Sequence, residues 1–234
     1  MGLDVEHRPS ESPYITRVWR ATGEQTVEAM TAVAYARWDL VFWEADGAMH
    51  VSVVGPESRA YAAPVPDATV SFGINFELGS VLPQLPASRQ VDGVADLPDA
   101  TGRRFQLAGS TWDLPSYDNA EAFVAALVRE GLLVQDRLVT DLHRGASTDL
   151  SPRTEQRRFA AATGLTRSTA RQIDRARNAA VLIQEGRSFD DVIAELGYYD
   201  QAHLGRSLSH YIGRTPTQLR RDTPDQPLSL LYKT

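Results

Sequence analysis

"DVIAELGYYDQAHLGRSLSHYIGRTP", residues 191–216, decides the fold because two helical segments flank a glycine in it. Gly197 falls where a helix-turn-helix needs either a positive φ or a close approach of the two helices. The apolar residues around this turn recur at helical spacing. They are Phe189, Val192, Ile193, Tyr198, Leu204, Leu208 and Tyr211. We therefore expect a helix-turn-helix with these side chains in its core.

The opposite face of the second helix in this stretch has few groups that can read DNA. The residues expected there are Gln201, Ala202, Gly205, Arg206 and Ser209. Only Gln201 and Arg206 can hydrogen-bond strongly to a base edge, and Ala202 can contact a thymine methyl group. An alternative for Arg206 is a salt bridge with Glu195 or Asp200. His203 lies towards the core side, where a packed or capping role is expected.

Capping signals predict that the whole C-terminal half is helical, with about seven helices. The predicted helices cover about residues 118–129, 134–143, 152–164, 167–185, 188–197, 200–213 and a short segment from 215. The expected N-caps are Asp118, in a capping box with Glu121, then Ser151 before Pro152, Thr166, Ser188 and Asp200. Each of these side chains can accept a hydrogen bond from a free backbone N–H of the first helical turn.

The N-terminal half has a different pattern, with short runs of β-branched and aromatic residues between turn formers. Residues 38–43 and 48–54 flank Asp46-Gly47, a strong hairpin turn signal. Residues 68–79 form another predicted strand, with Val70, Phe72, Ile74 and Phe76 on one face. Six aromatic residues of this half are mostly expected in its core, with a ligand pocket as the alternative. They are Trp19, Trp38, Phe42, Trp43, Phe72 and Phe76.

The net charge of −6 hides an asymmetry between the halves. Residues 1–118 carry 8 Arg and 16 acidic residues, whereas residues 151–221 carry 12 Arg and 7 acidic residues. A basic segment joined to an acidic one suggests that only the C-terminal part meets a polyanion. Guanidinium groups suit bidentate contacts with phosphate or guanine.

Residues 191–216 resemble the second helix-turn-helix of AraC/XylS-type transcription regulators. The matching residues are Gly197, Tyr198, Asp200, His203, Leu204, Arg206, Leu208, Gly213 and Pro216. "SPRTEQRRF", which begins residues 151–164, is similar to the first recognition helix of that family. The resemblance covers about residues 119–221 and implies two helix-turn-helix motifs joined by a long helix, about residues 167–185. Such a helix is about 28 Å long, which would let a monomer reach two half-sites about 34 Å apart.

The first recognition helix has the richer set of readers. Arg153, Gln156 and Arg157 share one face, and arginine reads guanine while glutamine suits adenine. With Gln201, Ala202 and Arg206 they are the predicted base contacts. The predicted backbone or supporting contacts are Thr154, Ser209, His210 and Arg171. For Arg153, Arg157 and the stripe of Arg167, Arg171 and Arg175, a solvated surface role is the alternative.

The fold class expected is α+β, with a small antiparallel β domain before an all-α domain. The expected divisions are a tail (1–13), a β domain (14–110), a linker (111–118), a DNA-binding domain (119–222) and a second tail (223–234). The family resemblance implies that the β domain is cupin-like and binds an effector. It also implies a bacterial regulator that contacts RNA polymerase if it is an activator.

Several classes of chemistry are not expected. The absence of cysteine excludes disulfides and thiolate sites, and the five histidines are scattered. No cofactor or metal is predicted, the position of any ligand pocket is unknown, and no segment is apolar enough to span a membrane. The N-terminus lacks the pattern of a secretory signal, so the cytoplasm is the expected compartment.

We therefore expect a regulator that binds double-stranded DNA and has no enzymatic activity. One alternative is an antagonist that has lost base reading and binds another regulator, which Gly205 favours. The other is a small enzyme built on the β domain, which no nucleophile elbow, metal cluster or phosphate loop supports.

Overall fold

The computed structural model describes residues 4–22, 29–64, 68–221 and 227–229. Their contacts group the chain into two compact units. The sheet unit comprises residues 1–26, 37–56 and 66–166, and the helical unit comprises residues 27–36, 57–65 and 167–234. Each unit is described below by itself.

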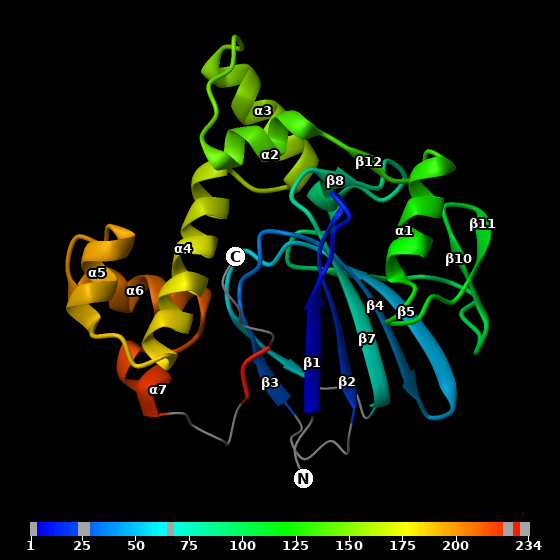
Figure 1. Ribbon diagram of the computed structural model, residues 1–234, viewed down its shortest axis with the longest axis horizontal. Coiled ribbons are helices and arrows are strands. Elements are labelled where there is room, and N and C mark those ends of the chain that lie inside the picture. The colour runs from blue at the N-terminus through cyan, green and yellow to red at the C-terminus, as the bar shows by residue number, and fades with distance from the viewer. Residues whose placement is uncertain (1–3, 23–28, 65–67, 222–226, 230–234) are drawn as a thin grey trace. The chain divides into compact units, whose positions relative to one another are not determined.

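The sheet unit is built on a six-stranded antiparallel sheet with the strand order β1-β2-β7-β4-β5-β9 (Figure 1). The strands are β1 (Asp4–Pro9), β2 (Ile15–Thr22), β4 (Asp39–Ala45), β5 (Ala48–Val54), β7 (Ala68–Phe76) and β9 (Val94–Asp96). Between β4 and β5, Asp46 and Gly47 have φ of 51° and 72°. Positive φ at both central residues is what the tightest hairpin turn requires, so the predicted hairpin is confirmed.

The smaller elements of this unit surround the sheet. They are β8 (Ser80–Val81), which pairs with β12 (Val134–Gln135); β10 (Arg104–Leu107), which pairs with β11 (Ser110–Asp113); the 3₁₀ helix η1 (Ala87–Arg89); and the helices α1 (Ala120–Arg129), α2 (Arg137–Arg144) and α3 (Pro152–Thr163). The core lies between one face of the sheet, the β10–β11 hairpin and α1. Trp38 and Phe76 stack in it at 3.8 Å between ring centroids, and Phe42 meets the edge of Phe105. Burial of each such side chain stabilises the fold by about 1.5–3 kcal/mol.

The aromatic residues divide between the two sheet faces. Trp38, Phe42 and Phe76 are buried in the core, and Phe72 packs against it. Trp19 pairs in register with Gly73 and Trp43 with Ser71, on the alternate positions of their strands. A β-carbon at Gly73 would lie 2.5 Å from the Trp19 indole, so glycine makes room for that ring. The predicted core therefore holds for four of the six aromatic residues.

Some predicted elements are wrong where the pairing is not local. The predicted tail at residues 1–13 contains strand β1, and the predicted linker at 111–118 begins inside β11. The predicted helix over 134–143 is replaced at its start by β12, which pairs with β8 before α2 begins. The N-cap of α1 is Asn119 instead of Asp118, and its side chain makes no capping hydrogen bond.

The helical unit contains four helices and a two-stranded ribbon (Figure 1). The helices are α4 (Arg167–Gln184), α5 (Phe189–Leu196), α6 (Gln201–Tyr211) and α7 (Pro216–Arg221), and the ribbon pairs β3 (Ala29–Ala32) with β6 (Tyr61–Pro64). Helix α4 packs against α5, α6 and α7. The predicted division into a β domain at 14–110 and a DNA-binding domain at 119–222 remains a prediction, although the contacts place β3 and β6 with the C-terminal helices.

Candidate nucleic-acid interface

The first helix pair, α2 and α3, has the predicted caps on its second helix. The hydroxyl of Ser151 accepts a hydrogen bond from the Thr154 backbone N–H at 3.3 Å, and Pro152 occupies the first turn. Gly164 ends α3 in the left-handed conformation. The guanidinium of Arg158 donates to the carboxylate of Asp136 at 2.8 Å, which ties α3 to the start of α2. Phe159 anchors the buried side of α3.

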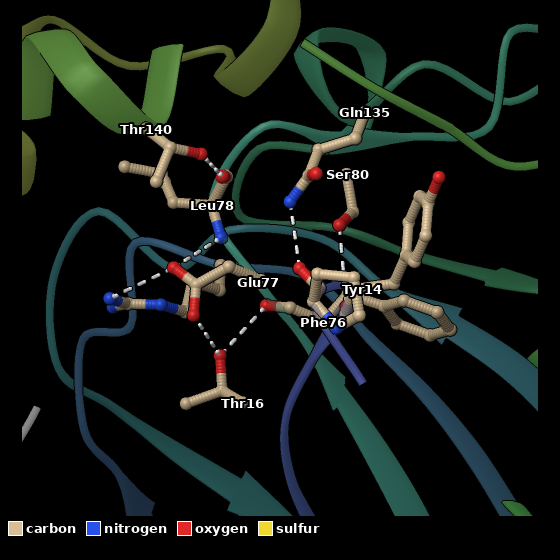
Figure 2. Close-up of polar contacts among 10 residues, drawn as sticks. Tyr14, Thr16, Phe76, Glu77, Leu78, Ser80, Gln135 and Thr140 are labelled. Carbon is tan, nitrogen blue, oxygen red and sulfur yellow. Dashed lines mark hydrogen bonds and ion pairs between the residues drawn. The ribbon is translucent and has the colours of Figure 1, made fainter. Parts of the chain in front are cut away.

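The first pair is also fastened to the β7–β8 loop (Figure 2). The hydroxyl of Thr140, on α2, donates to the backbone oxygen of Leu78 at 2.7 Å. Just before α2, the Asp136 backbone N–H donates to the Gly79 oxygen at 2.8 Å, and the Gln135 amide donates to the Pro13 oxygen at 2.7 Å. These bonds fix the orientation of α2, and through it that of α3, within the sheet unit.

The exposed face of α3 presents the predicted readers. Arg153, Gln156 and Arg157 are all exposed. Within the described part of the chain, none of these three side chains makes a hydrogen bond or an ion pair. Thr154 is half-buried and its hydroxyl lies 3.0 Å from that of Ser151, so it supports the N-terminal cap of the helix. Three long polar side chains thus point outward with their donors unused.

The second helix pair, α5 and α6, is also capped as predicted. The Ser188 hydroxyl accepts from the Asp191 N–H at 3.1 Å, and the Asp200 carboxylate accepts from the His203 N–H at 2.6 Å. Gly197 ends α5 with a φ of +69°, and a β-carbon there would meet nothing within 4 Å. The glycine is therefore needed for its positive φ, and a close approach of the helices plays no part.

The side of α6 that faces α4 is buried. Leu204 and Leu208 are fully buried, and the hydroxyl of Tyr198 lies 3.3 Å from that of Ser207. The Arg175 guanidinium of α4 lies 4.5 Å from the centroid of the Tyr198 ring. Burial raises the pKa of the Tyr198 hydroxyl, which therefore stays protonated at neutral pH.

The outward face of α6 forms a shallow depression of about 590 Å³. It is lined by Ala202, Gly205, Arg206, Ser209, His210 and Thr215. The Arg206 side chain is exposed, and no hydrogen bond or ion pair links it to another described residue. Its two expected partners are engaged elsewhere, because Glu195 pairs with Arg187 at 3.1 Å and Asp200 caps α6.

Two further side chains modify this face. The Gln201 amide donates to the carboxylate of Asp190 at 3.2 Å, so one of its two predicted reading groups is held within the protein. Tyr199, in the turn before α6, is 90% exposed. Sequence reasoning did not single it out, because a tyrosine beside the buried Tyr198 reads as part of the core. His203 has the predicted capping role, since its Nδ1 accepts from the Tyr199 N–H at 3.3 Å.

The predicted arginine stripe on α4 lines a second groove, of about 490 Å³. Its lining residues are Arg167, Ser168, Arg171, Gln172 and Arg175. Arg171 is exposed, whereas Arg175 is half-buried and packs over Tyr198. The three arginines therefore have different surroundings, and Arg171 is the most accessible of them.

Comparison with protein families identifies the C-terminal segment. Residues 145–222 match the model of a helix-turn-helix domain family, so the chain carries a DNA-binding domain of the class found in transcription regulators. The domain is of the AraC type, which confirms the AraC/XylS family indicated by the sequence motifs. Comparison with curated proteins and with solved structures gives no significant match.

Two structural searches complete the description of the site. No helix within residues 4–22, 29–64, 68–221 or 227–229 is long and apolar enough to cross a membrane. Among these same residues, no three histidine or acidic side chains lie close enough together to hold a metal ion.

Proposed function

We propose that this protein binds double-stranded DNA in a sequence-specific manner and reads two half-sites, one with α3 and one with α6. The observation that carries the proposal is the state of the outward arginines. Arg153, Arg157 and Arg206 are exposed on helices whose other sides are buried, and their side chains have no partner among the described residues. A surface arginine without an internal partner keeps its whole donor fork for a ligand.

The chemistry of the two faces assigns different amounts of information to them. Arg153 and Arg157 can each donate a bidentate pair to O6 and N7 of guanine, and Gln156 can pair with adenine. On α6, Arg206 is the main reader, Ala202 contacts a thymine methyl group, and Gln201 must release Asp190 to use its second donor. The half-site of α3 is therefore the more selective one.

Phosphate contacts position the two helices on the duplex without reading sequence. Ser209 and His210 are exposed at the edge of the reading face of α6, and Arg171 is exposed on α4. We assign these three side chains to phosphates, and Thr154 to support of the α3 cap. The basic charge of residues 151–221 adds a salt-dependent attraction to DNA.

The acidic N-terminal half has a separate role in this proposal, which is to sense a small molecule or a protein partner. Its negative charge disfavours contact with DNA. Trp19 and Trp43 lie outside its hydrophobic core, which leaves two aromatic side chains for such a ligand. If the protein activates transcription, RNA polymerase is a further partner.

Selection of random duplexes by the purified protein tests this proposal. Recovery of a motif is expected, with affinity for the winning duplex falling about 5- to 150-fold in Arg153→Ala or Arg206→Ala. Arg129→Ala is the matched control, because Arg129 is an exposed arginine at the end of α1. If no motif is recovered and neither variant differs from this control, the proposal is wrong.

An antagonist that binds another regulator without reading DNA is the second candidate. Gly205 leaves a gap in the reading face of α6, and the Gln201–Asp190 hydrogen bond withholds a reader. Under this alternative the same selection recovers no motif, while the purified protein binds another regulator's DNA-binding domain.

A further inference from the structure

The recognition helix α6 ends against a piece of the N-terminal half of the chain. This piece is the ribbon, which we define as residues 29–36 and 57–64. Strand β3 pairs with β6 from Ala29↔Pro64 to Ala32↔Tyr61, and Tyr35 and Glu57 extend the pairing by a backbone bridge. The ribbon belongs to the helical unit by its contacts. In sequence, however, it interrupts the strands of the sheet.

The ribbon caps the C-terminal end of α6 through the backbone. The Ala34 N–H donates to the Tyr211 oxygen at 2.7 Å, and the Ala60 N–H donates to the His210 oxygen at 2.9 Å. The last four carbonyls of a helix have no partner within the helix. Two of the four are thus satisfied by the two arms of the ribbon, one arm each.

A buried arginine fastens the same arm to α4. Arg177 is 2% exposed, donates to the Ala34 oxygen at 3.0 Å, and its guanidinium lies 4.7 Å from the centroid of the Tyr35 ring. A guanidinium out of water is tolerated only when its donors are satisfied. Ala34 therefore receives a hydrogen bond from α4 and gives one to α6.

Close packing surrounds these bonds. Gly213 follows α6 with a φ of +72°, and a β-carbon there would lie 2.8 Å from a methyl carbon of Thr31 and 3.2 Å from the β-carbon of Ala60. Val33 and Ala34 are buried on the ribbon. The chain after α7 returns to the same strand, where Ser229 donates its backbone N–H to the Thr31 oxygen at 2.8 Å.

We propose that the ribbon is a positioning element for DNA reading by α6, which makes the second half-site dependent on the N-terminal half of the chain. The proposal rests on the proposed function. Residue 36 lies only three positions before β4, and residue 57 only three after β5. A change in the sheet strands, such as binding of an effector would cause, is passed along the backbone to the groups that hold α6.

The first test uses the full chain with Ala60→Pro, which removes the N–H that caps His210. Binding is measured to the selected duplex and to two derivatives, each with one half-site scrambled. For the wild type, we expect scrambling of the second half-site to weaken binding at least 10-fold. For Ala60→Pro we expect less than 2-fold, with binding to the first half-site retained. A wild-type gain from the second half-site in this variant would overturn the proposal.

A second variant keeps both backbone donors. Arg177→Met removes the hydrogen bond to Ala34 but retains an unbranched buried side chain. We expect it to lose part of the second half-site's contribution and none of the first's. Arg129→Met is the control for the same substitution at an exposed position, and an Arg177→Met protein that matches this control would contradict the proposal.

Hydrogen exchange tests the clamp without DNA. In Ala60→Pro, the amides of residues 208–212 should exchange at least 10-fold faster, because opening of the last turn of α6 no longer breaks the bond to Ala60. Unchanged exchange would overturn the positioning role. Failure of the wild type to select any duplex would instead overturn the proposed function, and the exchange result would still decide whether the ribbon holds α6.

Discussion

The two helix pairs are both fastened by segments from the N-terminal half of the chain, but at different places. The first pair is held at its first helix, where Thr140 and Asp136 bond to the β7–β8 loop (Figure 2). The second pair is held at the end of its recognition helix, where the ribbon caps α6. The difference teaches that the recognition helices are not equally independent: α3 is oriented through α2, whereas α6 is held directly.

The turns of the two pairs differ in the same sense. Gly164 and Gly197 both end a helix with positive φ. A β-carbon at Gly164 would lie 2.3 Å from a methyl carbon of Val91 and 2.8 Å from the α-carbon of Ser88, whereas one at Gly197 would meet nothing within 4 Å. The end of α3 is therefore pressed against the sheet unit, and the end of α5 is open.

The largest expected effect is the difference between Gly164→Ala and Gly197→Ala. Both variants strain a left-handed residue, which costs about 1–2 kcal/mol. Only Gly164→Ala adds a steric clash, so its total cost should be about 2–5 kcal/mol. Denaturant unfolding followed by circular dichroism measures both. Equal losses would show that the packing around Gly164 yields without cost.

The reading faces provide the next effect. Arg157→Ala and Arg206→Ala should each cost about 1–3 kcal/mol of binding free energy and relax the preference at one position of their own half-site. The selected motif should carry more information in the half-site of α3, because α3 has three unengaged readers. Sequencing of the selected duplexes measures the information in each half. Equal information, or uniform weakening across all sequences, would assign these arginines to phosphates.

Sequence predicted the features of both pairs that depend on local geometry. Ser151, Ser188 and Asp200 were identifiable as caps because a capping side chain reaches only two or three residues along the chain. The outward positions of Arg153 and Arg206 follow from the 3.6-residue period, which a buried apolar side makes unambiguous.

The attachments of the pairs could not be predicted, because each joins residues far apart in sequence. Ala34 and Tyr211 meet through backbone atoms, which every residue type possesses. Strand β12 has two residues, too few for an alternating pattern, and its partner β8 lies more than fifty residues earlier. Arg177 did offer a signal, since a charged residue between Ile173 and Ala180 interrupts an otherwise apolar stripe of α4.

A smaller effect is expected inside α6. Gly205 has helical neighbours on both sides, and a β-carbon there would meet nothing within 4 Å. Gly205→Ala should therefore stabilise the protein by about 1 kcal/mol, since alanine is the better helix former by that amount. Thermal unfolding measures the gain, with Ala202→Gly on the same face as a control of opposite sign. A destabilised Gly205→Ala protein would show that α6 needs a flexible residue at this position.

The smallest effect is the pH dependence of a clamp in the sheet unit. Hydrogen bonds from the Arg8 guanidinium lower the pKa of the Glu121 carboxyl, on α1, from 4.5 to about 2. Arg8 also lies 5.0 Å from the centroid of the Tyr117 ring. Because the folded pKa is the lower one, the stabilisation is complete above about pH 4.5 and disappears as the pH falls towards 2. The pair is partly exposed, so solvent screening limits its contribution to about 1 kcal/mol or less.

Glu121→Gln should therefore be less stable than the wild type at pH 6 and equally stable near pH 2. Denaturant unfolding across this range measures the difference, and Glu130→Gln, which removes an exposed carboxylate just after the same helix, is the matched control. A deficit in Glu121→Gln that does not change with pH would mean that the contact stabilises by packing and not by charge. Since the clamp joins β1 to α1 in the sheet unit, acid should loosen the unit that carries α3 while leaving the bond between Ala34 and Tyr211 in place.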